Sequence, residues 1–187
     1  PLADADTQAV TVAALRALGW RSRERSLREL LSARFGPEVM ALEAGDAVVP
    51  GAGSQLGWLL WADALEPPAA AAAAARLCEP DILCAFGLRT LASSAPQFCA
   101  HLYHRGSVWP FDSWLGWGGL RAAGWLDEAE RVRAGVLGAL ERLGRAPELY
   151  AVTVDGALEP IAAANRVQAW TIGARWALEN AWDGLVR

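Results

Sequence analysis

The sequence contains no lysine, and all 17 of its basic residues are arginine. Acidic residues number 21, which gives a formal net charge of −4. The densest basic stretch, residues 21–28, is interrupted by Glu24 and followed by Glu29, a pattern typical of a solvated helix face. This charge pattern does not favour nucleic acid as a partner.

Long hydrophobic runs are missing as well, although 53% of the 187 residues are hydrophobic. Apolar stretches are too short, or too broken by charge, to cross a bilayer, so we expect no membrane partner. The first residues have neither the basic head nor the apolar core of a secretory signal. We therefore expect one cytoplasmic domain spanning residues 1–187, because no composition shift marks a domain boundary.

Cysteine and histidine are scarce, with three and two residues respectively. The cysteines lack CxxC spacing, and neither histidine has a carboxylate at ligand spacing, so we expect no disulfide framework, metal or cofactor. His101 and His104 are three residues apart in one segment.

Hydrophobic periodicity predicts helices, separated by long segments rich in glycine and proline. No stretch alternates convincingly as a strand, although short hairpins fit within the loops. The sequence therefore predicts an all-α fold of helical hairpins whose loops gather at one end, where sites usually lie. The expected helices cover residues 7–18, 23–35, 58–65, 67–78, 113–123, 127–143 and 166–182, and the expected loops 42–57, 79–112 and 144–165.

Tryptophan is abundant, with 10 residues, and three of them lie in the segment Tyr103–Leu120. This segment mixes aromatic side chains with His, Arg and Asp, which a buried core does not need. Aromatic faces stack on the apolar faces of sugar rings, and polar side chains bind the hydroxyls. The segment therefore indicates a saccharide pocket, with Trp109 as the expected stacking surface.

Two polar residues have two possible roles each. Asp112 either caps a helix that starts at Ser113 or binds a sugar hydroxyl. Arg89 either bridges loops through backbone carbonyls or contacts substrate, because its five donors suit both roles. Gln168 and Trp170 stand near a helix start and are expected to face the pocket. The spacing of Trp176 and Trp182 with neighbouring apolar residues predicts core positions.

A series of motifs resembles the glycogen-debranching-type amylo-α-1,6-glucosidases, within the (α/α)6-barrel glycosidases. The motifs cover essentially the whole chain, in the same order as in that family. One departure is Trp58, which replaces a histidine typical of relatives. The matching segments are Ser54–Trp61, Phe86–Leu91, Tyr103–Pro110, Pro147–Tyr150 and Val167–Trp170.

The resemblance implies a fold and a site. The chain looks like the C-terminal half of a twelve-helix toroid, and the half that carries the family's general acid, an aspartate, is not in this sequence. Glu148 takes the position of the general base of an inverting α-glucosidase. The turn Tyr103-His104-Arg105 would form the pocket floor, with a purely structural histidine as the competing interpretation.

Two other interpretations remain beside hydrolysis. A half-barrel without its acid could be non-catalytic, serving as structure or as a weak saccharide-binding module. A sugar epimerase of the same fold needs paired histidines for proton transfer, which His101 and His104 do not supply in the usual way. An open half-toroid would also expose apolar surface, so we expect association with the missing half or with a second copy.

Overall fold

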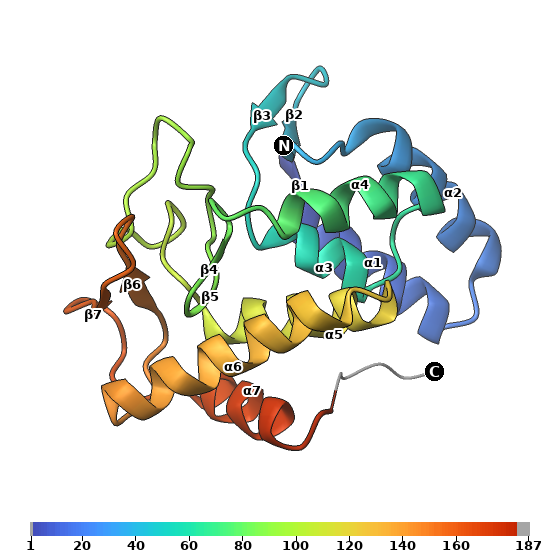
Figure 1. Cartoon of the computed structure of the whole chain (residues 1–187). Coiled ribbons are helices and arrows are strands. Elements are labelled where there is room, and N and C mark those ends of the chain that lie inside the picture. The colour runs from blue at the N-terminus through green and yellow to red at the C-terminus, as the bar shows by residue number, and fades with distance from the viewer. Residues whose placement is uncertain (1, 183–187) are drawn as a thin grey trace.

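The structure, a computed structural model, describes residues 2–182 and is mostly helical, as predicted (Figure 1). Seven helices lie within the described residues, joined by loops that contain short strands. The helices are α1 (Ala5–Ala17), α2 (Arg21–Arg34), α3 (Gln55–Trp61), α4 (Pro67–Leu77), α5 (Pro110–Ala122), α6 (Leu126–Leu143) and α7 (Ala169–Glu179).

The helices form two curved rows. α1, α3, α5 and α7 contact one another in that order and make the inner row. In the outer row, α2 packs on α1, α4 on α3, and α6 on α5, so each consecutive pair is a helical hairpin. This arrangement is an arc of an (α/α) toroid.

Three small antiparallel sheets lie outside the predicted helices. The strands are β1 (Leu2–Asp4), β2 (Val39–Glu43) and β3 (Val48–Pro50), then β4 (Leu83–Cys84) with β5 (Gly87–Leu88), and β6 (Tyr150–Val152) with β7 (Leu158–Pro160). The prediction of a loop over residues 42–57 is therefore wrong at both ends, because it contains the end of β2, all of β3 and the start of α3.

The start of α5 also differs from the prediction. The helix begins at Pro110, three residues before Ser113, because proline fits the first helical position and forces an extended conformation on Trp109 before it. Asp112 is therefore the third residue of the helix, not its N-cap. The predicted C-terminal helix is shorter at both ends, running from Ala169 to Glu179.

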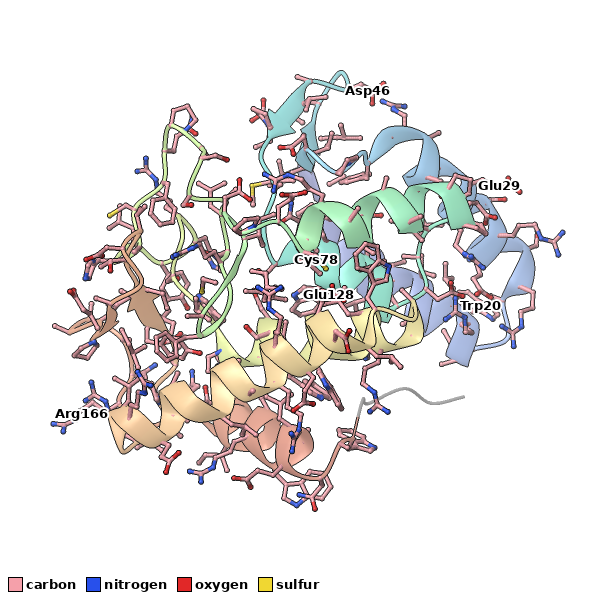
Figure 2. All side chains as sticks on the ribbon, viewed as in Figure 1. Trp20, Glu29, Asp46, Cys78, Glu128 and Arg166 are labelled. Carbon is pink, nitrogen blue, oxygen red and sulfur yellow. The ribbon has the colours of Figure 1, made fainter. Side chains whose placement is uncertain are left out.

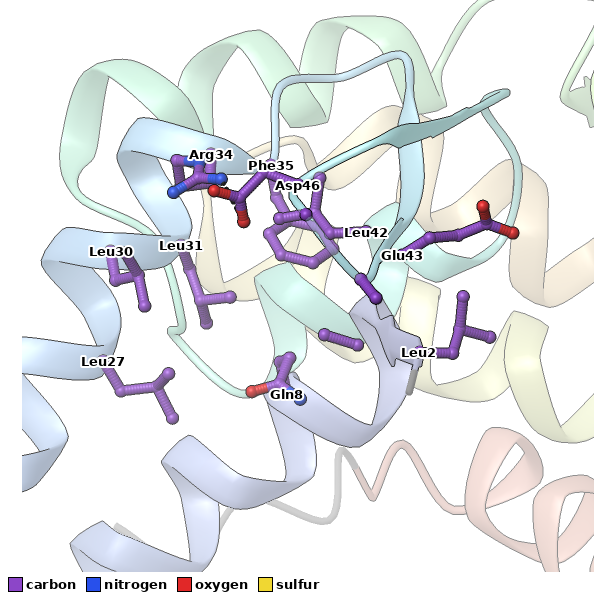
Figure 3. A pocket seen from close by; sticks show the side chains of 13 residues that line it. Leu2, Gln8, Leu27, Leu30, Leu31, Arg34, Phe35, Leu42, Glu43 and Asp46 are labelled. Carbon is purple, nitrogen blue, oxygen red and sulfur yellow. Dashed lines mark ion pairs between the residues drawn. The ribbon is translucent and has the colours of Figure 1, made fainter.

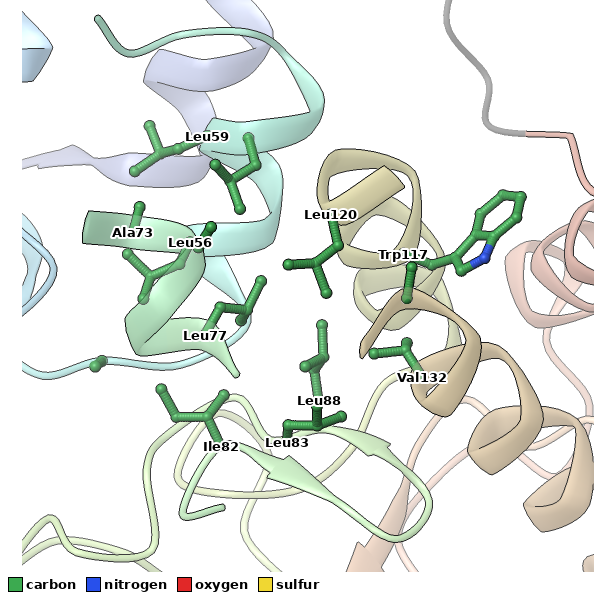
Figure 4. Close-up of a cluster of buried hydrophobic side chains, with 14 of the residues drawn as sticks. Leu56, Leu59, Ala73, Leu77, Ile82, Leu83, Leu88, Trp117, Leu120 and Val132 are labelled. Atoms are coloured by element: carbon green, nitrogen blue, oxygen red, sulfur yellow. The ribbon is translucent and has the colours of Figure 1, made fainter. Parts of the chain in front are cut away.

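Much of the core lies between α3, α4, α5 and α6, where leucines pack with alanine, valine, isoleucine and tryptophan side chains (Figure 4). Leu56, Leu77, Leu88 and Leu120 are almost completely buried there. α3 and α5 approach so closely that a Cβ on Gly119 would lie 2.7 Å from the backbone nitrogen of Trp61. Glycine is thus required where the two inner helices touch.

Two tryptophans expected in the core lie at the surface. Trp176 is 56% exposed and Trp182 is 50% exposed, since α7 has a neighbour on only one side in the described chain. The apolar spacing of α7 therefore marks a face that the described residues leave largely exposed. None of the described helices has the length and hydropathy needed to cross a membrane.

Candidate functional site

The site lies where two long loops meet the beginnings of the inner helices. Val108 forms β-bridges with both Arg89 and Tyr150, which ties the loop before α5 to the loop before α7. These loops, with β4 to β7, lie together at one end of the molecule (Figure 1). The predicted gathering of loops is found here.

Glu148 is the centre of the site. Only 6% of its surface is exposed. The Tyr103 hydroxyl donates a hydrogen bond to Oε1 at 2.7 Å, and the side-chain Nδ2 of Asn165 donates one to Oε2 at 3.0 Å. The carboxylate therefore stands in a fixed orientation next to the predicted aromatic segment.

Tyr103 connects this carboxylate to an aromatic cluster. Its ring meets His104 and Trp109 edge-on, with centroids 4.6 and 4.7 Å away. His104 in turn stacks on Trp109 at 5.1 Å and an interplanar angle of 15°. The hydrogen bond to Glu148, and to a smaller extent burial, raises the pKa of the Tyr103 phenol. Tyr103 remains 51% exposed, so a ligand can reach it.

The accessible stacking surface is Trp170 rather than Trp109. Trp109 is only 7% exposed, and its indole N–H is used by the Tyr103 carbonyl and the Ser107 hydroxyl, each at 3.2 Å. Trp170, at the start of α7, stacks near Trp109 with centroids 6.3 Å apart and is 44% exposed. Phe111 lies 6.4 Å from Trp170 and extends the apolar surface.

Asp112 lies on the α3 side of this cluster and is bound by a residue at the start of α3. It is 9% exposed and accepts a hydrogen bond from the Ser54 hydroxyl at 2.7 Å. Burial raises the pKa of the Asp112 carboxyl, while the Ser54 hydrogen bond, Trp58 and the nearby His104 act in the opposite direction. Burial and then repulsion from Asp112 and Asp4 raise the pKa of Asp6 to about 7.

The two arginines predicted for the site point elsewhere. Arg89 is 3% exposed and donates to the Val152 and Thr153 carbonyls, so its geometry is that of the bridge between loops. Arg105 is exposed and donates to the Gln97 carbonyl at 3.1 Å within its own loop. Both guanidinium groups are thus engaged with backbone carbonyls outside the aromatic cluster.

Gln168 stands at the N-cap position of α7, where its backbone N–H donates to the Ala146 carbonyl at 2.9 Å. This bond holds the start of α7 beside the segment that carries Glu148. The structure thus brings Tyr103, His104, Trp109, Glu148 and Trp170 into one cluster, with Asp112 at its edge. Gln168 is placed by its backbone at the start of α7, two residues before Trp170.

Three contributors were missed by sequence reasoning: Asn165, Ser54 and Asp6. Asn165 binds Glu148, 17 positions away in the sequence, and Ser54 binds Asp112, 58 positions away. No local sequence pattern predicts such contacts. Asp6 directly precedes the first predicted helix, residues 7–18, and nothing in the sequence shows that its carboxyl group is buried near Asp112.

Other features of the described residues do not suggest a second reaction centre. A pocket of about 370 Å³ lies between α2 and the first sheet, lined mainly by apolar side chains such as Leu31, Phe35 and Leu42 (Figure 3). The half-buried Cys78 lies near Glu128, and burial followed by that carboxylate raises its thiol pKa to about 11 (Figure 2). No group of three or more potential ligand side chains in the described chain could hold a metal ion.

The geometry suits the recognition of a neutral, ring-shaped polyol. Accessible aromatic faces on Tyr103 and Trp170 lie beside a buried carboxylate whose oxygens accept hydrogen bonds, and a second carboxyl, Asp112, stands at the far edge. Rings of sugars stack on such faces while carboxylates bind hydroxyls or activate water.

Solved structures share the fold. An uncharacterized conserved protein from Thermus thermophilus superposes with a TM-score of 0.73 at 22% identity, covering 96% of this chain and 47% of its own. The GH63 mannosylglycerate hydrolase from the same organism, in complex with glucose, gives a TM-score of 0.71 at 21% identity over 96% and 48%. Its complex with Tris and D-glycerate gives a TM-score of 0.70 at 19% sequence identity, and the superposition covers 96% of this chain and 46% of that one. The chain spans about half the length of these relatives.

Comparison at the level of sequence families is more specific. No curated protein sequence matches the chain. A family model, the mannosylglycerate hydrolase MGH1-like glycoside hydrolase domain, matches residues 13–151. The predicted (α/α)6 glycosidase resemblance is thus supported, but the glycogen-debranching assignment within it is not. Because the match extends over most of the sequence, the chain belongs to the MGH1-like glycoside hydrolase domain family.

Proposed function

We propose that this chain supplies the general-base side of a glycoside hydrolase site that acts on α-glycosidic bonds with inversion. The observation that carries the proposal is the buried Glu148 carboxylate, held by Tyr103 and Asn165 beside accessible aromatic rings. Glu148 accepts a proton from water, the water oxygen bonds to the anomeric carbon, and the glycosidic bond breaks. The leaving oxygen takes its proton from an acid outside this chain.

The glycone in this proposal is a neutral hexose such as glucose or mannose. Tyr103, His104, Trp170, Asp112 and Gln168 would hold it by stacking and hydrogen bonding. Both arginines expected at the site are engaged with backbone carbonyls, which leaves the Asp112 and Glu148 carboxyl groups beside the aromatic cluster. If the aglycone is an acid such as glycerate, the cation that binds it comes from outside this cluster, because carboxylates repel each other.

The complementary half of the toroid is the proposed partner. α1 and α7 end the inner row, and both expose apolar residues, including Val10 on α1, Leu18 just after it, and Ile172 and Trp176 on α7. Relatives are about twice as long as this chain. Helices that complete the ring would cover these faces and bring the general acid toward Glu148.

Glycosyl fluorides test the proposal without the missing acid, because fluoride leaves without being protonated. We expect the chain to release fluoride from α-glucosyl or α-mannosyl fluoride and to form the β-sugar first, as seen by proton NMR. Isomaltose and mannosylglycerate should be cleaved only when a complementary half is added. A folded chain that turns over no fluoride would instead support the alternative, a non-catalytic half-barrel.

A further inference from the structure

The carboxylate of Glu148 is held on both oxygens, but by partners of different character. On Oε1 the donor is the Tyr103 phenol, which is 51% exposed and open to solvent. On Oε2 both donors come from Asn165: the backbone N–H at 3.3 Å and the side-chain Nδ2 at 3.0 Å. One oxygen thus faces the accessible cluster, and the other is bound to the loop before α7.

The contact between Asn165 and Glu148 is reciprocal. The backbone N–H of Glu148 donates to the Asn165 carbonyl at 2.9 Å, so the two residues exchange main-chain and side-chain bonds. The same two segments are joined again by the Thr171 hydroxyl, which donates to the Pro147 carbonyl at 2.8 Å. The backbone around Glu148 is therefore fixed even without the Asn165 side chain, and the amide acts on the carboxylate itself.

From this geometry, and resting on the proposed function, we propose that Asn165 is a positioning residue for the general base. Its amide fixes Oε2 and so leaves Oε1, on the Tyr103 side, as the oxygen that receives the proton of the attacking water. The terminal torsion of a glutamate side chain has a broad, shallow preference, so an unanchored carboxylate would rotate. Loss of the amide should misdirect the base without weakening substrate binding.

Tyrosine titration tests this orientation without any substrate. The chain has only two tyrosines, and burial raises the pKa of Tyr150 well above 10, so the first transition in absorbance at about 295 nm belongs to Tyr103. Glu148→Gln should lower the pKa of Tyr103 toward 10, because the carboxylate that raises it is gone. Asn165→Ala should lower it in the same direction, as Oε1 turns away. Asn180→Ala, a matched change at the end of α7, should leave it unchanged.

Kinetics with α-glucosyl fluoride give the second readout. Asn165→Ala should lower kcat by about 10- to 100-fold, the usual cost of a small misplacement, with KM within about twofold. In Asn165→Asp the ionised side chain repels Glu148, so kcat should fall further, and it should recover relative to wild type as pH falls and the new acid becomes a donor.

The outcomes separate the two proposals. A wild-type chain that releases no fluoride refutes the proposed function, while the tyrosine titration still decides whether Asn165 orients Glu148. An Asn165→Ala variant whose Tyr103 titrates as in wild type overturns the positioning role. The positioning role is also overturned if Asn165→Ala raises KM as well as lowering kcat, or if it changes neither.

Discussion

The Tyr103 hydroxyl donates a hydrogen bond to Oε1 of Glu148 at 2.7 Å, although the two residues are 45 positions apart in the sequence. This bond joins the loop before α5 to the loop before α7. It places the aromatic cluster of His104, Trp109 and Trp170 directly beside a buried carboxylate. Aromatic rings and a carboxylate that can accept a proton thus lie in one cluster, the combination that the proposed hydrolysis needs.

Trp170 should contribute to saccharide affinity. Its ring is 44% exposed and stacks near Trp109, so it can cover one face of a sugar. We expect Trp170→Ala to raise the Kd for glucose or mannose by about 3- to 10-fold, the range typical of one aromatic contact. Isothermal titration calorimetry or quenching of tryptophan fluorescence would measure the change.

Trp176 provides the matched control for Trp170. It lies on the same helix and is 56% exposed, but its ring contacts Trp182 rather than the site cluster. Trp176→Ala should leave the Kd unchanged. Equal losses in both variants would mean that the sugar binds the outer face of α7 and not the pocket.

Asp6 should make stability depend on pH. Its pKa is raised from an ordinary 3.8 to about 7, so the folded chain binds the Asp6 proton more tightly than the unfolded chain. The resulting stabilisation is complete below about pH 4 and is lost as pH rises toward about 7. The loss is at most about 4 kcal/mol, from roughly 1.36 kcal/mol per pKa unit. Asp6→Asn should remove this decline, as measured by urea unfolding between about pH 4 and 8.

Asp155→Asn is the control for this titration. Hydrogen bonds, first from the Thr153 hydroxyl, lower the pKa of the exposed Asp155 below its ordinary 3.8, so this group stays ionised above about pH 5. Substitution of Asp155 should leave the change in the free energy of unfolding between about pH 5 and 8 as in wild type. If Asp6→Asn keeps the wild-type decline, Asp6 is not the group responsible.

Two glycines in neighbouring helices should respond to alanine with opposite signs. A Cβ at Gly119 would lie 2.7 Å from both the Cβ of Leu60 and the backbone nitrogen of Trp61, so α3 and α5 would have to separate. We expect Gly119→Ala to cost about 2–3 kcal/mol. Gly138 in α6 has no such neighbour within 4 Å, and Gly138→Ala should stabilise the chain by about 0.5–1 kcal/mol.

Thermal unfolding would separate these two variants, because about 1 kcal/mol shifts the Tm of a domain of this size by about 2–4 °C. A Gly119→Ala variant as stable as Gly138→Ala would show that the inner helices do not pack as closely as the structure indicates.

Local patterns were sufficient to locate all seven described helices, because amphipathic spacing and proline or glycine boundaries are short-range signals. They failed where a residue's role depends on distant partners. Asp112 resembles an N-cap, but Pro110 starts the helix earlier and Ser54 holds the carboxylate from another element. Trp176 has core spacing, but the described residues leave 56% of its surface exposed.

The site was only partly readable for the same reason. Aromatic and polar residues concentrated in Tyr103–Leu120 indicated a saccharide pocket, and the motif around Glu148 indicated a base. The sequence could not show that Trp109 would be enclosed while Trp170 stayed accessible, or that Asn165 would reach Glu148. Burial and long-range contacts emerge only when the loops fold together.

The most direct test of Glu148 as the base compares fluoride release from α-glucosyl and α-mannosyl fluoride by wild type, Glu148→Gln and Glu141→Gln. Glu141 is an exposed glutamate of α6 outside the site, so its variant should match wild type. Glu148→Gln keeps the shape of the side chain and removes the base, and its rate should fall by about 10²-fold or more while sugar binding persists. Unchanged release by Glu148→Gln would contradict the central claim that Glu148 is the general base.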